Sequence, residues 1–205
     1  MSHPDTGLLI SCLKTMGNII SSKDERVSLI KENPDLISIL RKLADSKKKN
    51  IRQEVFWILS NIKTENIMGD SGFVEMIIKE VKSNSGIASR YAVCILTNST
   101  ANCPPAQLIR LLENGVFECL VSVLDIGDDE DYDEKIVMLA LEGINNCLEL
   151  GKKWNLKDES GRNKFLVELE KEGGIEKIEK LKLHSSEKLS VPAKKITEIV
   201  EISEL

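Results

Sequence analysis

An asparagine recurs at long and nearly regular intervals along this chain, and this pattern limits the possible folds more than any other feature. The four residues are Asn18, Asn61, Asn98 and Asn146, which are 43, 37 and 48 residues apart. Intervals of roughly 40–47 residues are typical of units of two or three helices that stack into a solenoid, because one such unit cannot bury its own apolar face. The pattern therefore predicts a helical repeat array.

Apolar residues recur at helical spacing through most of the chain. Three stripes are clear: Leu36, Ile37, Leu40 and Leu43; Val55, Ile58, Leu59 and Ile62; and Val116, Leu120, Val123 and Leu124. Breaks typical of helix ends lie at Asn33-Pro34, Gly69-Asp70, Asn84-Ser85-Gly86, Pro104-Pro105, Asn114-Gly115 and Gly173-Gly174. The clearest predicted helices are Ser71–Lys82, Ile87–Ala101, Pro105–Glu113, Val116–Leu124 and Asp133–Leu150. No strand pattern of comparable strength is present, so the predicted fold class is all-α.

The composition is that of a folded chain, with 41% hydrophobic and 30% charged residues. Five cysteines, an odd number without a Cys-x-x-Cys pair, favour reduced thiols in an intracellular protein. No apolar run approaches the ~18 residues that a membrane span needs, so we expect no membrane partner. The net charge of −5 argues against a nucleic-acid ligand and favours a basic partner.

The recurring asparagines are candidates for a binding surface. Asparagine is a mediocre residue for a helix interior, so its repetition at one phase of successive helices calls for a reason. A carboxamide offers two donors and one acceptor oxygen, and a row of them on the concave face of a solenoid could pair with the backbone of an extended peptide. For any single asparagine, a solvated helix position is the simpler interpretation.

Trp57 and Glu54 would add specificity to such a surface. Trp57 precedes Asn61 by one helical turn, so the indole and the carboxamide project from one face. An exposed indole attracts a lysine ammonium, with roughly 0.5–2 kcal/mol of stabilisation, and Glu54 could supply the opposing charge. The alternative interpretation is that Trp57 belongs to the core.

The segment Ile51–Ile62 closely resembles the importin-alpha family, whose repeats carry a tryptophan and an asparagine four residues apart on the groove helix. Leu13–Ile20 is similar to the groove helix of the sixth repeat of that family, and Arg90–Asn98 to that of its eighth repeat. The similarity continues through the ninth and tenth repeats at Gln107–Gly115, Ala140–Gly151 and Gly174–Ser186. The resemblance covers nearly the whole chain and implies a right-handed α-solenoid of armadillo repeats.

The resemblance also implies a function. It implies that the chain spans the family's minor site for lysine- and arginine-rich nuclear localisation signals of cargo proteins. The residues on matching positions are Asn18, Ser21, Glu54, Trp57, Ser60, Asn61 and Asn98, with weaker matches at Lys14, Tyr91, Cys94 and Asn146. It further implies nuclear import with an importin-beta partner, an export receptor that engages roughly Asp133–Leu205, and shuttling between cytoplasm and nucleus.

The chain departs from the family pattern at several positions. Cys94 replaces the last signal-binding tryptophan, and Tyr91 replaces the acidic residue before it. Lys14 stands where the family usually has arginine, and an ammonium lacks the bidentate geometry of a guanidinium. Glu142 occupies the tryptophan position of the following groove helix. We expect weaker or narrower binding of signals at this site.

The predicted domain organisation is one armadillo domain over residues 1–205, with a partial first repeat. The expected divisions are 1–22 (groove helix of the partial repeat), 23–64, 65–102 and 103–151 (full repeats) and 152–205 (C-terminal capping repeat). The importin-beta-binding segment and the major signal site of the family have no counterpart in the sequence. A fragment and a natural short form are both open, and a start within a repeat favours the fragment.

An enzyme is not expected. His3 and His184 are the only histidines, and no phosphate-binding loop, nucleophile elbow or metal-ligand spacing is present, so we expect no catalytic residue, metal or cofactor. The acidic stretch Asp125–Glu134 lacks the spacing of a calcium loop and is interpreted as a solvated loop. An alternative function is an armadillo scaffold without signal binding that contacts a partner or forms a homodimer through exposed apolar helices at the N-terminus.

Overall fold

The computed structural model describes residues 6–22, 33–62, 65–83, 86–101, 103–126 and 132–203. The described residues form α-helices joined by short turns, with no β-strand among them and a single isolated bridge between Lys157 and Asn163. The predicted all-α fold class is therefore confirmed. The chain divides into two compact units, Met1–Ile95 and Leu96–Leu205.

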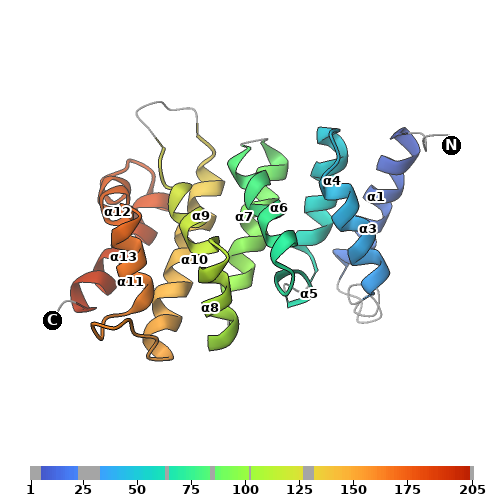
Figure 1. Ribbon diagram of the computed structural model, residues 1–205. Coiled ribbons are helices and arrows are strands. Elements are labelled where there is room, and N and C mark those ends of the chain that lie inside the picture. Colours follow the sequence, from blue (N-terminus) through green and yellow to red (C-terminus); the bar gives the residue numbers. More distant parts are fainter. Residues whose placement is uncertain are drawn as a thin grey trace. The chain divides into compact units, whose positions relative to one another are not determined.

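In its described residues, the first unit contains five helices and the start of a sixth, shown from blue to green in Figure 1. They are α1 (Thr6–Ile20), α3 (Pro34–Ala44), α4 (Lys49–Ser60), α5 (Glu65–Met68), α6 (Ser71–Lys82) and the first part of α7 (Ile87–Thr100). α4 packs against both α1 and α3, and α5 packs against α6. The helix α4 is thus the element around which the N-terminal end of this unit is built.

Capping residues set the helix starts that the sequence predicted in this unit. The side chain of Asn33 accepts hydrogen bonds from the backbone N–H groups of Asp35 and Leu36, and Pro34 occupies the first helical position of α3. Asp70 accepts from the N–H of Phe73 and begins α6 in the same way. Each cap satisfies backbone donors that have no partner inside the helix.

The apolar stripe of α4 forms the centre of the core. Val55, Ile58 and Leu59 have no exposed surface, and Ile62 is 4% exposed. Full burial of each such side chain is worth roughly 1.5–3 kcal/mol relative to exposure. The stripe of α3 is buried at Leu36 and Leu40, whereas Ile37 and Leu43 are only partly covered.

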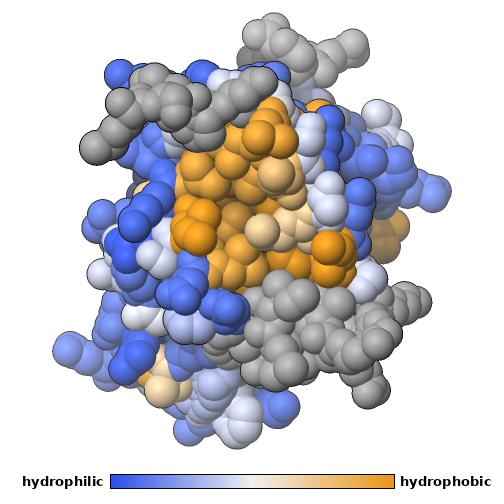
Figure 2. All heavy atoms as spheres, turned by 90° about the vertical axis from the view of Figure 1, so that its right-hand side faces the viewer, coloured by the Kyte–Doolittle hydropathy of each residue, from blue (hydrophilic) through white to orange (hydrophobic). Residues whose placement is uncertain are grey.

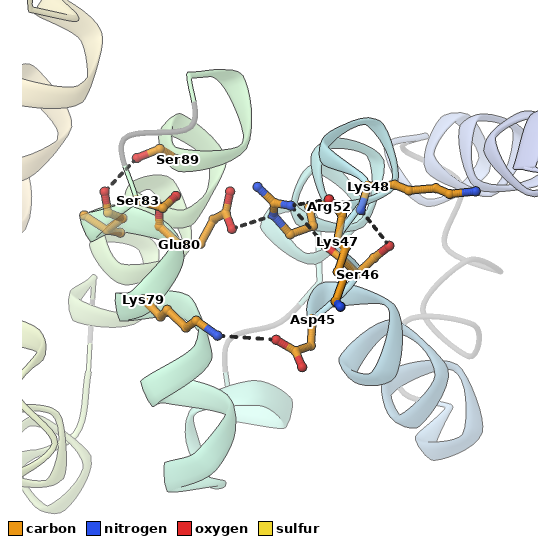
Figure 3. Close-up of polar contacts among 10 residues, drawn as sticks. Asp45, Ser46, Lys47, Lys48, Arg52, Lys79, Glu80, Ser83 and Ser89 are labelled. Carbon is orange, nitrogen blue, oxygen red and sulfur yellow. Dashed lines mark hydrogen bonds and ion pairs between the residues drawn. The ribbon is translucent and has the colours of Figure 1, made fainter.

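A buried ion pair joins α4 to α6. The Arg52 guanidinium donates to the Glu80 carboxylate at 2.9 Å, and Glu80 is only 6% exposed. As Figure 3 shows, Arg52 also points at the turn before α4, where it donates to the carbonyl of Ser46 at 3.0 Å. Because both side chains are largely removed from water, loss of Glu80 would leave the Arg52 guanidinium without a countercharge.

The second unit contains the end of α7 and six further helices, from yellow-green to red in Figure 1. They are α8 (Pro105–Glu113), α9 (Val116–Ser122), α10 (Glu134–Lys153), α11 (Lys164–Lys171), α12 (Gly174–Lys182) and α13 (Glu187–Ser203). α10 packs against α9 and α13, and α12 packs against α13. Gly115 and Gly173 have positive φ values of 74° and 65° just before α9 and α12, which explains the breaks predicted there.

The predicted helix bounds agree with the structure to within three residues. Ser71–Lys82 and Pro105–Glu113 are reproduced, α9 ends at Ser122, and α10 begins at Glu134 and continues to Lys153. His3, Asn84-Ser85 and residues 127–131 of the acidic stretch lie outside the described residues. The predicted repeat divisions stay a prediction. In the part of the chain that the structure describes, no helix is both long enough and apolar enough to span a membrane.

Candidate peptide-binding site

A cavity in the first unit brings several of the predicted site residues together. Its volume is about 280 Å³, and the residues that line it are Lys14 and Asn18 from α1, Gln53, Glu54 and Trp57 from α4, and Tyr91 from α7. Five of these six were candidates on the basis of the sequence. The cavity arises because α1 packs directly on α4, which places the two helix faces beside each other.

Gly17 fixes the position of the indole in this cavity. A Cβ atom built at Gly17 would lie 2.6 Å from Cε3 and 2.9 Å from Cη2 of Trp57, and closer still to Cζ3. The similar distances to three ring atoms place the benzo ring with its face over Gly17. One indole face is therefore covered by the backbone of α1, and another part of the side chain lines the cavity. Trp57 is partly exposed, so it serves both packing and the cavity.

Glu54 is a nearly buried carboxylate that lacks a cationic partner. It is 8% exposed and lines the cavity. No ion pair or hydrogen bond joins its carboxylate to any residue that the structure describes. The carboxylate keeps access to the cavity and has no cationic partner among the described residues, so it can attract a cation that enters there.

The two asparagines of this unit have different roles. Asn18 lies within α1, is exposed, and its side chain has no hydrogen-bond partner among the described residues. Asn61 follows the last residue of α4 as its C-cap, and its Nδ2 donates to the carbonyl of Trp57 at 2.9 Å. The expectation that both carboxamides stand free on a long helix is therefore wrong for Asn61, because α4 ends at Ser60 and the amide satisfies one of the last carbonyls.

The hydroxyl groups of the predicted site are also engaged within their own segments. Ser21 Oγ donates to the carbonyl of Asn18 at 3.1 Å, and Ser60 Oγ donates to the carbonyl of Trp57 at 2.8 Å. Each hydroxyl oxygen keeps its acceptor capacity. Ser21, Ser60 and Asn61 are not among the residues that line the cavity.

The remaining asparagines belong to the second unit. Asn98 is exposed near the end of α7. Asn146 is partly buried in α10, and its Nδ2 donates to Oγ1 of Thr100 at 3.2 Å. Glu142, at the position where the resemblance would place a tryptophan, is exposed. Of the two recurring asparagines in this unit, Asn146 joins neighbouring helices.

Gln53 and Gly17 are the site residues that sequence reasoning missed. Gln53 precedes Trp57 by four residues, so helical spacing could have placed it on the same face. Gly17 directly precedes Asn18 in the chain, and its role depends on the packing of α1 against α4. Cys94 is partly exposed and follows Tyr91 by one turn of α7, but it is not among the residues that line the cavity.

A second feature of the first unit is an apolar face on α1. A groove of about 460 Å³ is lined by Ser11, Cys12, Thr15, Met16 and Ile19. Figure 2 views the end of the molecule that carries α1 and shows apolar surface gathered there. Leu8 and Ile19 are 63% and 46% exposed. Lys14 is the only charged residue of α1, and it does not line this groove. The face is therefore uncharged.

Metal-binding geometry is absent from the described residues, where no group of three or more His, Cys, Asp or Glu side chains could hold an ion. His184 lies in the turn before α13, where its Nε2 is 2.8 Å from the Tyr132 hydroxyl and its Nδ1 accepts from the N–H of Ser186. Hydrogen bonds from Ser186 and Lys188 lower the pKa of Glu134. These contacts hold the end of the acidic stretch against the turn before α13.

Comparison with solved structures defines the class of protein. The armadillo repeats only protein from Plasmodium falciparum has a TM-score of 0.73 at 14% identity and covers 97% of this chain and 82% of its own. A designed armadillo repeat protein in complex with the peptide (KR)4 has a TM-score of 0.62 at 21% identity, with 97% and 95% covered. The fold is therefore that of an all-α armadillo solenoid. No protein-family model matches the sequence.

Comparison with curated proteins gives relatives that are importin alpha subunits. Importin subunit alpha-1a from Oryza sativa subsp. japonica is 27% identical over 205 residues, covering 96% of this chain and 37% of the relative. Importin subunit alpha-4 from Arabidopsis thaliana is also 27% identical, over 207 residues, with 97% and 37% covered. The predicted resemblance to importin-alpha is confirmed, and the chain spans little more than a third of the length of these relatives.

These similarities bear on two further predictions. Importin-alpha and armadillo-repeat proteins are binding scaffolds without enzymatic activity, in agreement with the prediction that this chain is not an enzyme. Armadillo repeats bind peptides, as the designed complex illustrates. The chain therefore shares the fold of an armadillo repeat protein that has been seen with a bound peptide.

Proposed function

We propose that this chain binds lysine- and arginine-rich nuclear localisation signals in the cavity of its first unit and acts in nuclear protein import. The observation that carries the proposal is the nearly buried, unpaired carboxylate of Glu54 beside the seated indole of Trp57. The similarity to importin subunit alpha and the designed armadillo complex with (KR)4 support it.

The cavity suits one long cationic side chain. The methylene groups of a lysine pack on the part of Trp57 that lines the cavity, where the ring quadrupole attracts the ammonium. The ammonium then approaches Glu54, and the desolvated site strengthens that attraction relative to water. Asn18 is placed to pair with the peptide backbone through its carboxamide. The ammonium of Lys14 suits a peptide carbonyl at the edge of the cavity.

The wider partners of this activity follow from the same resemblance. The proposal includes an importin-beta partner in a longer protein, an export receptor at roughly Asp133–Leu205, and shuttling between cytoplasm and nucleus. Ser21, Ser60 and Asn61 lie outside the cavity, and we retain them as positions that a longer signal could reach beyond it. Asn98 stays a predicted signal-binding position of the second unit, and Cys94 a weaker one of the first. Asn146, whose amide donates to Thr100, is left out of the proposed site.

A fluorescence titration tests the proposal. Trp154 is the other tryptophan and is 43% exposed, so a Trp154→Phe background leaves Trp57 as the single reporter. Addition of a Lys/Arg-rich peptide should change the Trp57 emission, and the affinity should fall as salt is raised. Glu54→Gln should weaken binding at least tenfold, and Asn18→Ala should weaken it about threefold to tenfold.

The matched control is Glu142→Gln, which removes the same charge at an exposed position of α10. This variant should bind the peptide as the parent does. If Glu54→Gln and Glu142→Gln have equal effects, the peptide is attracted by net charge alone and the site assignment is wrong. An absence of any Trp57 response at low salt would refute signal binding here.

The apolar face of α1 favours a second candidate function, self-association through a second copy of the chain. An uncharged face pairs with its own copy without like-charge repulsion, and a two-fold arrangement would bring both α1 helices together. In this function the chain is a scaffold that dimerises through Leu8 and Ile19.

Sedimentation equilibrium separates the two candidates. A dimer should be lost in Ile19→Lys and kept in Ile39→Lys, which replaces an isoleucine of α3 that is 53% exposed. A parent chain that is monomeric at high micromolar concentration would exclude self-association through this face. Peptide binding that persists in Ile19→Lys would show that the two functions are independent.

A further inference from the structure

Two aromatic side chains line the cavity from different helices, Trp57 on α4 and Tyr91 on α7. In the described residues the ring pairs in contact are Phe117–Phe165 and Tyr132–His184. Trp57 and Tyr91 therefore bound the same cavity without stacking on each other, so a ligand group can lie between them. Neither ring carries a lysine or arginine of the described chain, since the cations that lie over rings are Arg41 over Phe73 and Lys153 over Trp154.

The position of Tyr91 gives this cavity a second aromatic side chain, whereas the repeats of the family that the chain resembles each carry one tryptophan. Cys94, one turn further along α7, cannot provide an aromatic wall, and it does not line the cavity. The second aromatic wall therefore stands in the same cavity as Trp57 and Glu54. Two aromatic side chains and a carboxylate without a cationic partner are the elements of a cage for an alkylated ammonium.

We infer that this cavity recognises a methylated lysine of a partner protein, with dimethyllysine preferred over unmodified lysine. The inference rests on the proposed function, because it assigns the ligand class of the same site. Each methyl group replaces a strongly hydrated N–H and packs against an aromatic face, so less hydration is lost on binding. The dimethylammonium keeps one N–H, which donates to the carboxylate of Glu54.

The residues of the cavity predict an order of ligands. Trimethyllysine fills the aromatic walls but has no N–H for Glu54, so it should bind more weakly than dimethyllysine. Unmodified lysine satisfies Glu54 but leaves the aromatic walls in poorer contact. Gln53 and Asn18 complete the polar part of the lining and are available to the peptide backbone. Lys14 opposes every cationic ligand equally and does not change the order.

A titration with four synthetic peptides tests this inference. The peptides share one Lys/Arg-rich sequence and differ at a single lysine, which is unmodified, monomethylated, dimethylated or trimethylated. In the Trp154→Phe background, we expect the dimethylated peptide to bind at least fivefold more tightly than the unmodified one. Tyr91→Leu removes the second aromatic ring and should reduce the ratio of the two affinities to less than twofold.

Two further variants assign the contributions. Tyr91→Phe retains the aromatic wall and should retain the preference for dimethyllysine. Glu54→Gln should weaken binding of the dimethylated peptide at least fivefold more than binding of the trimethylated peptide. Thermal unfolding of each variant is measured alongside to show that it is folded.

The outcomes separate this inference from the proposed function. Tight binding of the unmodified peptide with no gain on dimethylation overturns the inference and leaves the proposed function intact. Binding of the dimethylated peptide without binding of the unmodified one supports the inference and overturns the recognition of unmodified signals. If none of the four peptides binds, both are wrong.

Discussion

Glu80 and Glu54 are buried to a similar extent in the first unit, with 6% and 8% exposed, yet their surroundings differ. Glu80, on α6, accepts from the guanidinium of Arg52 at 2.9 Å. Glu54 lies on α4, two residues after Arg52, and has no ion pair with any described residue. One carboxylate thus joins two helices, and the other faces a cavity.

The difference shows that a buried charged side chain can serve either to join parts of the fold or to bind a ligand. A buried ion pair contributes little net stability, but its halves depend on each other. A buried charge without a partner costs free energy in the folded state, and a cationic ligand can recover that cost. The contrast between these two carboxylates is therefore the basis for placing the binding site at Glu54 and the structural junction at Glu80.

The largest expected effect is that of Glu80→Ala. Its removal leaves the buried guanidinium of Arg52 without a countercharge, and we expect a loss of about 3–5 kcal/mol in the free energy of unfolding. Urea denaturation followed by circular dichroism measures it. Glu75→Ala, an exposed position of α6, is the control and should change stability by less than about 0.5 kcal/mol. A loss below about 1 kcal/mol for Glu80→Ala would contradict the structural role.

Gly17→Ala is expected to have the next largest effect. The new Cβ overlaps the benzo ring of Trp57, so the indole must move, and overpacking of this kind costs about 1–3 kcal/mol. Peptide binding should also be lost, because the indole can no longer pack over residue 17.

Gly143→Ala is the matched control for that change. Its Cβ would lie 2.8 Å from Cδ1 of Leu120 in the second unit. It should destabilise the chain by a comparable amount without altering the Trp57 response to peptide. If the two variants cannot be told apart by peptide titration, Gly17 has no special relation to the site.

Asn146→Ala tests whether the asparagines of the two units differ. It removes the hydrogen bond to Thr100, so we expect about 1 kcal/mol of destabilisation and unchanged peptide binding. Asn18→Ala should show the opposite result, with unchanged stability and weaker binding, because its side chain is exposed. Equal behaviour of the two variants would remove the distinction between them.

The smallest expected change in stability is that of Glu54→Gln. Gln keeps the shape of the side chain and removes an unpaired buried charge, so stability should stay the same or rise by less than about 1 kcal/mol. The same urea titrations measure it. Destabilisation approaching that of Glu80→Ala would mean that Glu54 has a structural partner, and the comparison between the two carboxylates would fail.

The sequence alone predicted the helices and much of the cavity. Helical spacing of apolar residues and the Asn33-Pro34, Gly69-Asp70 and Asn114-Gly115 breaks depend on local backbone chemistry, which acts within a few residues. Trp57 and Glu54 could be paired for the same reason, since helical spacing places them on one face. These features needed no knowledge of how the helices pack.

Other features were decided by tertiary structure. Asn61 caps its own helix because α4 ends one residue earlier, a difference that periodicity does not resolve. Glu54 and Glu80 cannot be distinguished by residue type. Only the folded chain places Glu80 of α6 beside Arg52 of α4 and leaves Glu54 without a cation. Local spacing therefore determined the helices and their faces, whereas desolvation and charge pairing depend on contacts between distant segments and emerged only in the folded chain.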